Sequence, residues 1–170
     1  MVKKVHALHK AVADKLESIF PPNGFVKDEA CGGNQHIPLF CDRKKTRATQ
    51  YCNVDLLVLK ENRVRAIIEI EESNVKPTQV CGKFLTSALA RYYIHDNKEN
   101  EIVEMDEDVA FIQILDASKL RANSAKRKQW KTIERSIKSI LPLRNSRITS
   151  YTLVTTDELD GLAPFLREIT

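Results

Sequence analysis

Residues 51–72 read YCNVDLLVLKENRVRAIIEIEE, and this stretch decides how the chain folds. Two runs within it, residues 51–59 and 63–71, are rich in Val, Ile and Leu, which favour β-strands. The polar pair Glu61-Asn62 between them is short enough for a hairpin turn. Because apolar residues occupy both faces of each run, the sequence predicts two paired central strands that are covered on both sides.

Helical and strand patterns alternate on both sides of this pair. The expected helices cover residues 1–20, about sixteen residues starting near Pro77, residues 122–141 and residues 157–168. The remaining expected strands cover residues 37–41, 109–115 and 151–155. No repeat or shift in composition divides the chain, and its length suits one hydrophobic core. We therefore expect a single α/β domain over residues 1–170, with the element order αβββαβαβα and a mixed central sheet of about five strands between helices.

The composition is that of an ordinary globular protein. Hydrophobic residues make up 42% of the 170 residues and charged residues 29%, with 5 Gly and 6 Pro, which argues against a disordered or collagen-like chain. The longest apolar runs, such as residues 56–59, are far too short to span a membrane. The N-terminus lacks the apolar core of a signal peptide. We expect a cytoplasmic protein without a membrane partner.

Charge is distributed unevenly along the chain. The total formal charge is +4, but residues 119–147 contain ten basic residues and one acid, Glu134, and so carry +9. The rest of the chain carries −5, and residues 96–108 are strongly acidic. Such segregation indicates a basic surface that binds a polyanion.

Two basic clusters are expected to contact phosphate groups, one in the second long helix and one in the loop before Asp55. Their members are Lys126, Arg127, Lys128 and Lys131 in the helix and Arg43, Lys44, Lys45 and Arg47 in the loop. Such side chains supply affinity for nucleic acid without reading its sequence. For the helix, a solubilising role is an equal alternative. We expect the loop to open at the same sheet edge as Asp55.

Three carboxylates lie inside the most apolar strands, where an unpaired charge is costly. Asp55 interrupts the first strand, and Glu69 and Glu71 interrupt the second. Alternate residues of a strand share a face, so Glu69 and Glu71 project together, and in a hairpin Asp55 lies toward the same end of the neighbouring strand. Three converging carboxylates suit Mg²⁺ or Mn²⁺. The alternatives are a solvated strand end for Glu71 and an ion pair with a basic residue for Asp55.

The spacing of these acids, together with the element order, resembles the PD-(D/E)xK nuclease superfamily, also called the restriction-endonuclease-like fold. The resemblance rests on VDLLV at residues 54–58 and IIEIE at residues 67–71, and the element order extends it over residues 2–155. It implies a metal-dependent endonuclease that hydrolyses DNA phosphodiester bonds in restriction, repair or recombination. It also implies Mg²⁺ or Mn²⁺ as the cofactor and DNA as the partner. At this chain length, we expect selectivity to come from loops and from a homodimer.

The resemblance assigns a role to each motif position. Asp55 and Glu69 match the two acids that hold the metal, and the backbone carbonyl of Ile70 matches the ligand between the last two motif positions. Glu71 stands where the motif usually has Lys, although some restriction endonucleases look similar there. A Glu can act as a general base or as a ligand of a second metal. The missing positive charge then comes from another element, and Lys83 on the following helix is the preferred substitute.

Other metal-binding patterns are less specific. Some members of the superfamily draw an extra acidic ligand from the first helix, and Glu17 resembles that ligand by location. The four histidines lack the spacing of metal motifs, so none is assigned a catalytic role. A separate hypothesis is a zinc site formed by Cys31, His36, Cys41 and Cys52. Since no two cysteines are closely spaced, we favour free thiols.

The sequence leaves three classes of function open. The first is the metal-dependent endonuclease. The second is a catalytically inactive module of the same fold, which lost its activity together with the motif lysine and binds nucleic acid or protein. The third is a zinc-stabilised interaction domain.

Overall fold

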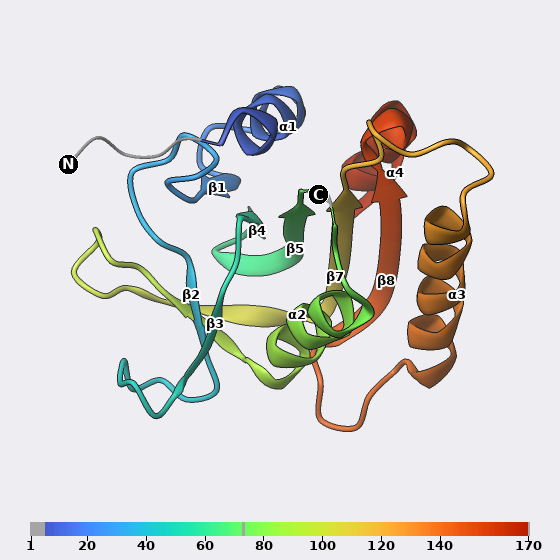
Figure 1. Ribbon diagram of the computed structural model, residues 1–170. Coiled ribbons are helices and arrows are strands. Elements are labelled where there is room, and N and C mark those ends of the chain that lie inside the picture. Colours follow the sequence, from blue (N-terminus) through green and yellow to red (C-terminus); the bar gives the residue numbers. More distant parts are fainter. Residues whose placement is uncertain (1–5, 73, 170) are drawn as a thin grey trace.

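The structure is an α/β fold in which helices cover both faces of one mixed sheet (Figure 1). The computed structural model describes residues 6–72 and 74–169, and within them there are four α-helices, one 3-10 helix and eight strands. The helices are α1 (Ala7–Glu17), α2 (Pro77–Leu89), α3 (Ala125–Ile140), η1 (Thr156–Gly161) and α4 (Leu162–Ile169). The strands are β1 (Phe25–Lys27), β2 (Pro38–Phe40), β3 (Gln50–Asn53), β4 (Leu56–Lys60), β5 (Arg63–Glu71), β6 (Tyr92–Ile94), β7 (Ile102–Leu115) and β8 (Ile148–Thr155). The expected α/β class is thus confirmed.

The predicted hairpin forms at the centre of the sheet. Strands β4 and β5 are antiparallel, and Lys60 lies opposite Arg63. The two residues between them, Glu61 and Asn62, have φ angles of 50° and 57°. Two consecutive positive φ angles are typical of a type I′ turn, whose twist matches that of the flanking strands. The polar pair recognised in the sequence is therefore the turn that sets the register of the hairpin.

The strands follow the order β1-β4-β5-β7-β6-β2-β3, and β8 pairs with β7. β7 is parallel to both β5 and β8, whereas the other pairs are antiparallel. Parallel neighbours need long crossover connections, and helices α2 and α3 lie in the two connections that lead to β7 and β8. The strands β5, β7 and β8 consequently end at the same edge of the sheet.

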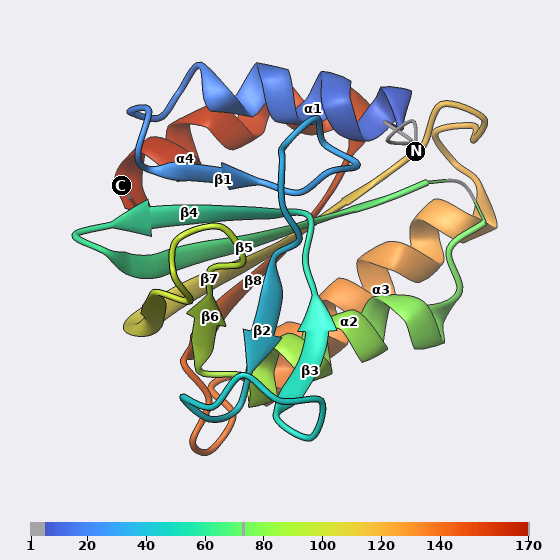
Figure 2. The same cartoon turned by 90° about the vertical axis from the view of Figure 1, so that its left-hand side faces the viewer.

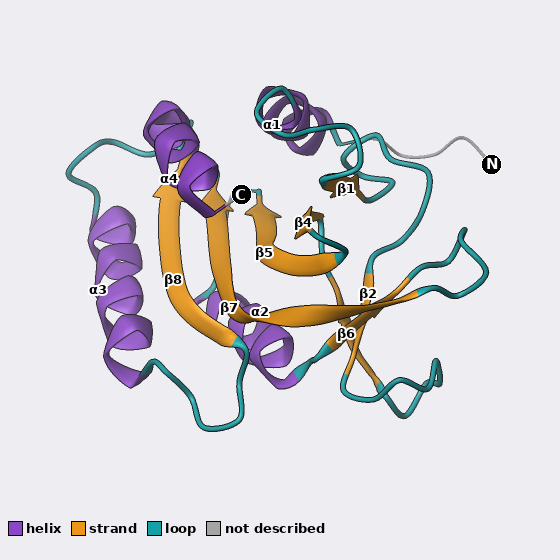
Figure 3. Ribbon diagram, turned by 180° about the vertical axis from the view of Figure 1, so that it is seen from behind, coloured by secondary structure: helices purple, strands orange, loops and turns teal. Residues whose placement is uncertain are grey.

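Strand β7 is 14 residues long and bends strongly (Figure 3). Its first residues, Ile102 to Glu104, pair with β6, and its second half pairs with β8. The register with β5 shifts between Met105 and Ala110, an irregularity of the kind that bends strands. Figure 2 shows the result, with β2, β3 and β6 forming a leaf that crosses the direction of β4 and β5.

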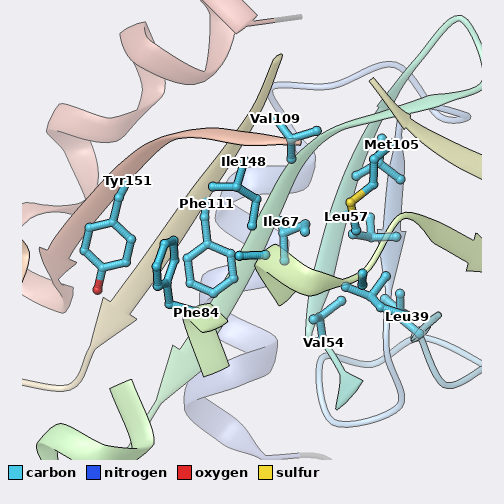
Figure 4. Packing of buried hydrophobic residues seen from close by; sticks show 14 of the residues in the cluster. Leu39, Val54, Leu57, Ile67, Phe84, Met105, Val109, Phe111, Ile148 and Tyr151 are labelled. Atoms are coloured by element: carbon cyan, nitrogen blue, oxygen red, sulfur yellow. The ribbon is translucent and has the colours of Figure 1, made fainter. Parts of the chain in front are cut away.

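Each face of the sheet packs against its own pair of helices (Figures 1 and 3). Helices α1 and α4 cover one face, in a core cluster that includes Leu16, Ile68 and Leu166. Helices α2 and α3 cover the other face, in a cluster that includes Ile67 and Phe84 (Figure 4). The neighbours Ile67 and Ile68 thus point into opposite clusters, as alternation along a strand requires. The predicted burial of this strand on both faces is confirmed.

The sequence predicts one strand over residues 51–59, and this prediction is wrong at Asp55. β3 ends at Asn53 and pairs with β2, whereas β4 starts at Leu56 and pairs with β1 and β5. At the break, the Asp55 carboxylate accepts a hydrogen bond of 2.7 Å from the backbone N–H of Ile70. A side chain therefore takes the place of a strand carbonyl, and the chain changes partner strands at this point.

The sheet has eight strands rather than about five because short and acidic segments also join it. β1 and β6 have three residues each, too short for a periodic pattern to show. β7 starts at Ile102 instead of residue 109. In its first part, the buried residues Val103 and Met105 alternate with acidic side chains, as in a strand with one buried face. This alternation lies within the acidic residues 96–108, and the many acidic side chains there made the strand hard to recognise from the sequence.

The helices lie close to their predicted positions. α2 starts at Pro77 and α3 ends just before Leu141, as expected. The first five residues of the expected N-terminal helix lie outside the described residues, and the described part of that helix ends at Glu17. The expected C-terminal helix consists of η1 followed by α4. Across residues 6–72 and 74–169, no helix is long and apolar enough to cross a membrane.

Helix α2 should depend on Phe84 for its attachment to the sheet. The Phe84 ring packs edge-on against Phe111 and Tyr151, with ring centroids 5.7 and 5.4 Å away. We expect Phe84→Ala to lower the free energy of unfolding by about 3–5 kcal/mol, because apolar contacts are lost and a cavity remains. Leu85→Ala, on the exposed side of the same helix, should change it by less than about 0.5 kcal/mol. Urea denaturation of both variants measures the difference, and equal losses would contradict this packing.

Candidate functional site

The predicted site lies where strand β5 extends beyond its neighbour β4. Leu56, the first residue of β4, pairs with Ile68, so residues 69–71 of β5 project past the start of β4. Asp55 immediately precedes Leu56, and its Oδ2 atom accepts the hydrogen bond from the Ile70 N–H. The Asp55 carboxylate is thereby held against the backbone edge of β5.

Lys83 joins the carboxylates from helix α2. Its Nζ atom lies 3.1 Å from Oε2 of Glu69 and 2.7 Å from Oε1 of Glu71. A single ammonium group reaches both carboxylates because they project from the same face of β5. The prediction that Glu69 and Glu71 share a face is therefore confirmed. Lys83, the predicted substitute for the motif lysine, contacts both.

The site holds more negative charge than Lys83 neutralises. Glu69 is 1% exposed, and burial, followed by the nearby Asp55 carboxylate, raises its pKa well above the ordinary value, against the opposing effect of Lys83. Burial by itself would lower the pKa of Lys83, but the surrounding carboxylates of Glu69, Asp55 and Glu71 outweigh it and raise that pKa. Lys83 is consequently a firmly protonated cation that faces three carboxyl groups.

The oxygen atoms of the site fit a divalent cation. Oε1 of Glu69 is buried and receives no hydrogen bond from a described donor, and the neighbouring Asp55 carboxylate raises the pKa of Glu69, so both carboxyl groups can face one ion. Asp55 supplies a second carboxylate. In a strand, the N–H and C=O of one residue point to the same side, so the carbonyl of Ile70 faces the side of Asp55, to which its N–H donates. Oxygen donors with surplus negative charge favour Mg²⁺ or Mn²⁺.

Helix α1 brings to the site a histidine that the sequence motifs did not single out. The side chain of His9 is 11% exposed, and its Nε2 atom lies 3.8 Å from Oδ2 of Asp55. Its Nδ1 atom lies 3.4 Å from Oε1 of Glu72, and Nδ1 of His6 lies 3.2 Å from the same oxygen. His6 and His9 are three residues apart and so share one helix face. The three-residue spacing of His6 and His9 is the sequence signal for this pair. It differs from the wider spacing of the metal-binding motifs that were considered in the sequence.

Glu17, the ligand predicted on the first helix, contacts a different part of the molecule. Its Oε2 atom lies 2.6 Å from Nζ of Lys27. Glu17 is eight residues beyond His9, which corresponds to about 12 Å along a helix axis. The residue of α1 that lies beside Asp55 is therefore His9, while the role of Glu17 as a metal ligand stays a prediction.

Behind Asp55, the segment after β1 forms a small buried polar group. The N–H of Asp28 donates to the carbonyl of Asp55 at 3.0 Å, and Oδ1 of Asp28 accepts from the N–H of Cys31 at 2.9 Å. Burial raises the pKa of Asp28 and, with the added effect of Asp28 and Asp55, that of the Cys31 thiol. Burial thus favours the protonated thiol of Cys31, which is a poor nucleophile.

The predicted zinc ligands are not brought together. Across the described residues, metal-binding atoms from three or more side chains converge within 4.8 Å in two groups. These groups are His6, His9 and Glu72, and Asp28, Cys31 and Asp55. The other predicted ligands, His36, Cys41 and Cys52, belong to neither group. All four cysteines are free thiols, as expected.

The basic start of helix α3 lies at the sheet edge that carries the carboxylates. Strands β5, β7 and β8 end at this edge, and Figure 2 shows α1, α2 and α3 with their N-terminal ends toward it. A hollow of about 340 Å³ lies at this edge, and Asn74 after β5, Asp116 after β7, and Lys119 and Lys126 near the start of α3 line it. Helix N-termini and lysines make this edge attractive to phosphate groups.

The basic loop lies elsewhere, and the expectation that it opens beside Asp55 is wrong. The loop leads into the first residue of β3, whereas Asp55 follows the last, so the length of β3 separates them (Figure 2). Arg43 in the loop forms an ion pair with Glu104, and Nζ of Lys45 lies 2.5 Å from Oδ1 of Asp96. The acidic segment thus neutralises part of the loop.

Ion pairs also occupy part of the helix cluster. Nη2 of Arg127 lies 2.9 Å from Oδ2 of Asp157, and Nζ of Lys131 lies 3.8 Å from Oε2 of Glu134. The remaining basic residues predicted to contact nucleic acid form no ion pair with the described residues. They are Lys44, Arg47, Lys126 and Lys128.

Comparison of the chain with protein-family models, with curated proteins and with solved structures finds no match in any of the three. The function therefore has to be inferred from the site itself.

Stability should fall as Glu69 ionises. Because the folded-state pKa of Glu69 lies above its ordinary value of 4.5, the folded protein keeps a proton that the unfolded chain loses at lower pH. The resulting stabilisation is complete below about pH 4.5 and is lost as the pH rises through the folded-state pKa. We expect Glu69→Gln to remove this part of the pH dependence, because glutamine does not ionise.

Urea denaturation between about pH 4.5 and pH 8, without divalent metal, measures the effect. The wild type should lose more stability than Glu69→Gln over this range, since the other titrating groups are common to both proteins. Glu107→Gln, at a side chain that is 88% exposed, should keep the wild-type slope. Identical slopes for the wild type and Glu69→Gln would contradict the raised pKa.

Proposed function

We propose that this protein is a metal-dependent endonuclease of the PD-(D/E)xK type that hydrolyses DNA phosphodiester bonds. The observation that carries the proposal is the Lys83 ammonium group, 3.1 Å from Glu69 and 2.7 Å from Glu71, with Asp55 on the adjoining strand segment. The residue before β4 and the end of β5 thus supply acidic metal ligands, and helix α2 supplies a fixed cation. Both features favour phosphodiester hydrolysis, because each stabilises the negative charge that develops on the phosphate in the transition state.

The order of elements supports the proposal. Strands β1, β4 and β5 form an antiparallel series, β7 lies parallel to β5, and α2 lies in the connection between them. With β2, β3 and β6 set aside, the elements from α1 to β7 follow the order helix, three strands, helix, strand. The resemblance implied the same order but counted residues 37–41, now β2, as the first of the three strands, and β1 takes that place in the structure.

Asp55, Glu69 and the carbonyl of Ile70 would hold the metal. A bound Mg²⁺ or Mn²⁺ neutralises a phosphate oxygen and lowers the pKa of the attacking water. The buried Oε1 of Glu69 and the surplus of negative charge are the features that favour binding here. On the α1 side, the nearly buried ring of His9 closes the site next to Asp55.

Lys83 and Glu71 together account for the departure from the usual motif. The cation comes from α2 instead of from the end of β5, and the carboxylate in the motif position holds its Nζ atom at 2.7 Å. Lys83 stays protonated among the carboxylates and can stabilise the charge that develops on the phosphate. Glu71 therefore does not supply a positive charge itself, but it holds the ammonium group of Lys83 in position.

The start of α3 would contact the DNA backbone beside the site. Lys126 and Lys128 form no ion pair with the described residues, and Lys126 lines the hollow that leads to Asn74 after β5. Contacts of this kind hold the duplex in place but carry no sequence information. Lys44 and Arg47 would contribute more distant contacts. A homodimer and a cytoplasmic location remain parts of this proposal.

Purified protein should nick or cleave DNA only when Mg²⁺ or Mn²⁺ is present. We expect Asp55→Asn and Glu69→Gln each to lower the rate at least about a hundredfold, because each removes a charged ligand of the metal. Asp160→Asn, at a side chain that is 90% exposed, should leave the rate unchanged. Plasmid, single-stranded, branched and RNA substrates should be assayed in parallel. DNA binding without cleavage in either metal would instead favour the catalytically inactive module.

Lys83→Met tests the relocated cation. We expect the cleavage rate at saturating DNA to fall about 10²- to 10³-fold, because one charge-stabilising group is lost from the transition state, while DNA affinity changes little. Lys83→Arg should recover part of the rate, and Lys60→Met, at an exposed lysine of the hairpin, should cleave like the wild type. Single-turnover rates and circular dichroism separate catalysis from folding. Full activity in a folded Lys83→Met protein would refute this role.

A further inference from the structure

A second group of metal-binding side chains lies next to the carboxylate site. His6 precedes α1, His9 lies on α1 and Glu72 follows β5, and their ligand atoms lie within 4.8 Å of one another. Nδ1 of His6 and Nδ1 of His9 lie 3.2 and 3.4 Å from the same Oε1 atom of Glu72. Two histidines at the start of α1 thus converge on one oxygen atom of Glu72 at the end of β5.

One buried nitrogen atom of this group has no hydrogen-bond partner among the described residues. The contact between His6 and Glu72 has the geometry of a hydrogen bond. The Nδ1 atom of His9 is buried and lacks a hydrogen-bond partner within the described chain, although the Glu72 oxygen faces it. A buried nitrogen without a partner costs free energy, and a bound cation is one means of satisfying it.

We propose that His6, His9 and Glu72 bind a divalent transition-metal ion such as Zn²⁺, Co²⁺ or Ni²⁺. Ligand atoms at about 2.0–2.2 Å from a shared ion lie roughly 3–3.5 Å apart, and the separations of 3.2 and 3.4 Å fall in this range. Imidazole nitrogens favour these ions, whereas Mg²⁺ prefers oxygen ligands. The ligand chemistry therefore separates this site from the oxygen site of Asp55 and Glu69.

The position of the site allows an ion to enter and affects the neighbouring carboxylates. The side chains of His6 and Glu72 are 39% and 49% exposed, so the site is open to solvent. Three protein ligands leave coordination positions for water or another oxygen ligand. Nε2 of His9 points toward Asp55 while its Nδ1 faces Glu72, so the imidazole ring separates the two sites. A bound ion would fix the orientation of that ring.

Titration of the metal-free chain of residues 1–170 with Co²⁺, followed by visible absorption, tests the site. We expect one Co²⁺ per chain, which Zn²⁺ displaces and excess Mg²⁺ does not. His6→Ala and Glu72→Gln should each weaken Co²⁺ binding about tenfold or more, since each removes a ligand from an exposed position. His36→Ala, at an exposed histidine outside the group, and Glu69→Gln should both bind Co²⁺ like the wild type.

Three results would overturn the proposal. The first is unchanged Co²⁺ affinity in both His6→Ala and Glu72→Gln. The second is loss of binding in Glu69→Gln alone, which would place the ion among the carboxylates. The third is a thiolate-to-cobalt charge-transfer band, which would assign the ion to a cysteine. The proposal does not rest on nuclease activity: a protein that binds Co²⁺ as expected but never cleaves DNA would support this site and refute the proposed function.

Discussion

The hydrogen bond from the Ile70 N–H to the Asp55 carboxylate is the interaction on which the rest of the structure depends. A backbone N–H in a buried strand needs a partner, and here a side chain supplies it. Because that need is met, β4 can begin at Leu56 and leave the end of β5 uncovered. The preceding residues are then free to form β3, which pairs with β2 on the far leaf. One carboxylate thus decides both how the chain is distributed in the sheet and where its acidic residues gather.

The uncovered end of β5 concentrates charge in a way that ordinary packing does not explain. Buried carboxylates normally have matching cations, because the desolvation of an unmatched charge is costly. Here one lysine, Lys83, serves Glu69 and Glu71 while Asp55 lies close by, and the raised pKa of Glu69 reflects the imbalance. A bound divalent cation would balance this excess of negative charge. The energetic cost of burying these carboxylates together is itself a reason to regard the edge as functional.

Local signals in the sequence predicted the features that depend on neighbouring residues. The turn at Glu61-Asn62, the shared face of Glu69 and Glu71 and the helix that carries Lys83 all follow from periodicity and turn chemistry. The features that depend on distant contacts were missed. The break at Asp55 requires the N–H of a residue fifteen positions away. His9 meets Asp55 only because α1 packs across the sheet, and no spacing within the sequence encodes that contact.

The bend of β7 has a mechanical consequence. A single 14-residue strand belongs both to the leaf of β2, β3 and β6 and to the layer that carries the carboxylates, and it is hydrogen-bonded in each. The two parts are therefore not joined by a flexible linker, and the leaf cannot swing over the acidic edge without breaking strand pairs. Any closure around a bound polymer has to come from the loops and from the segment around the start of α1, where His6 and His9 lie at that edge. The leaf is thus a paired extension of the sheet, and its strands fix where the basic loop between β2 and β3 begins and ends relative to the carboxylates.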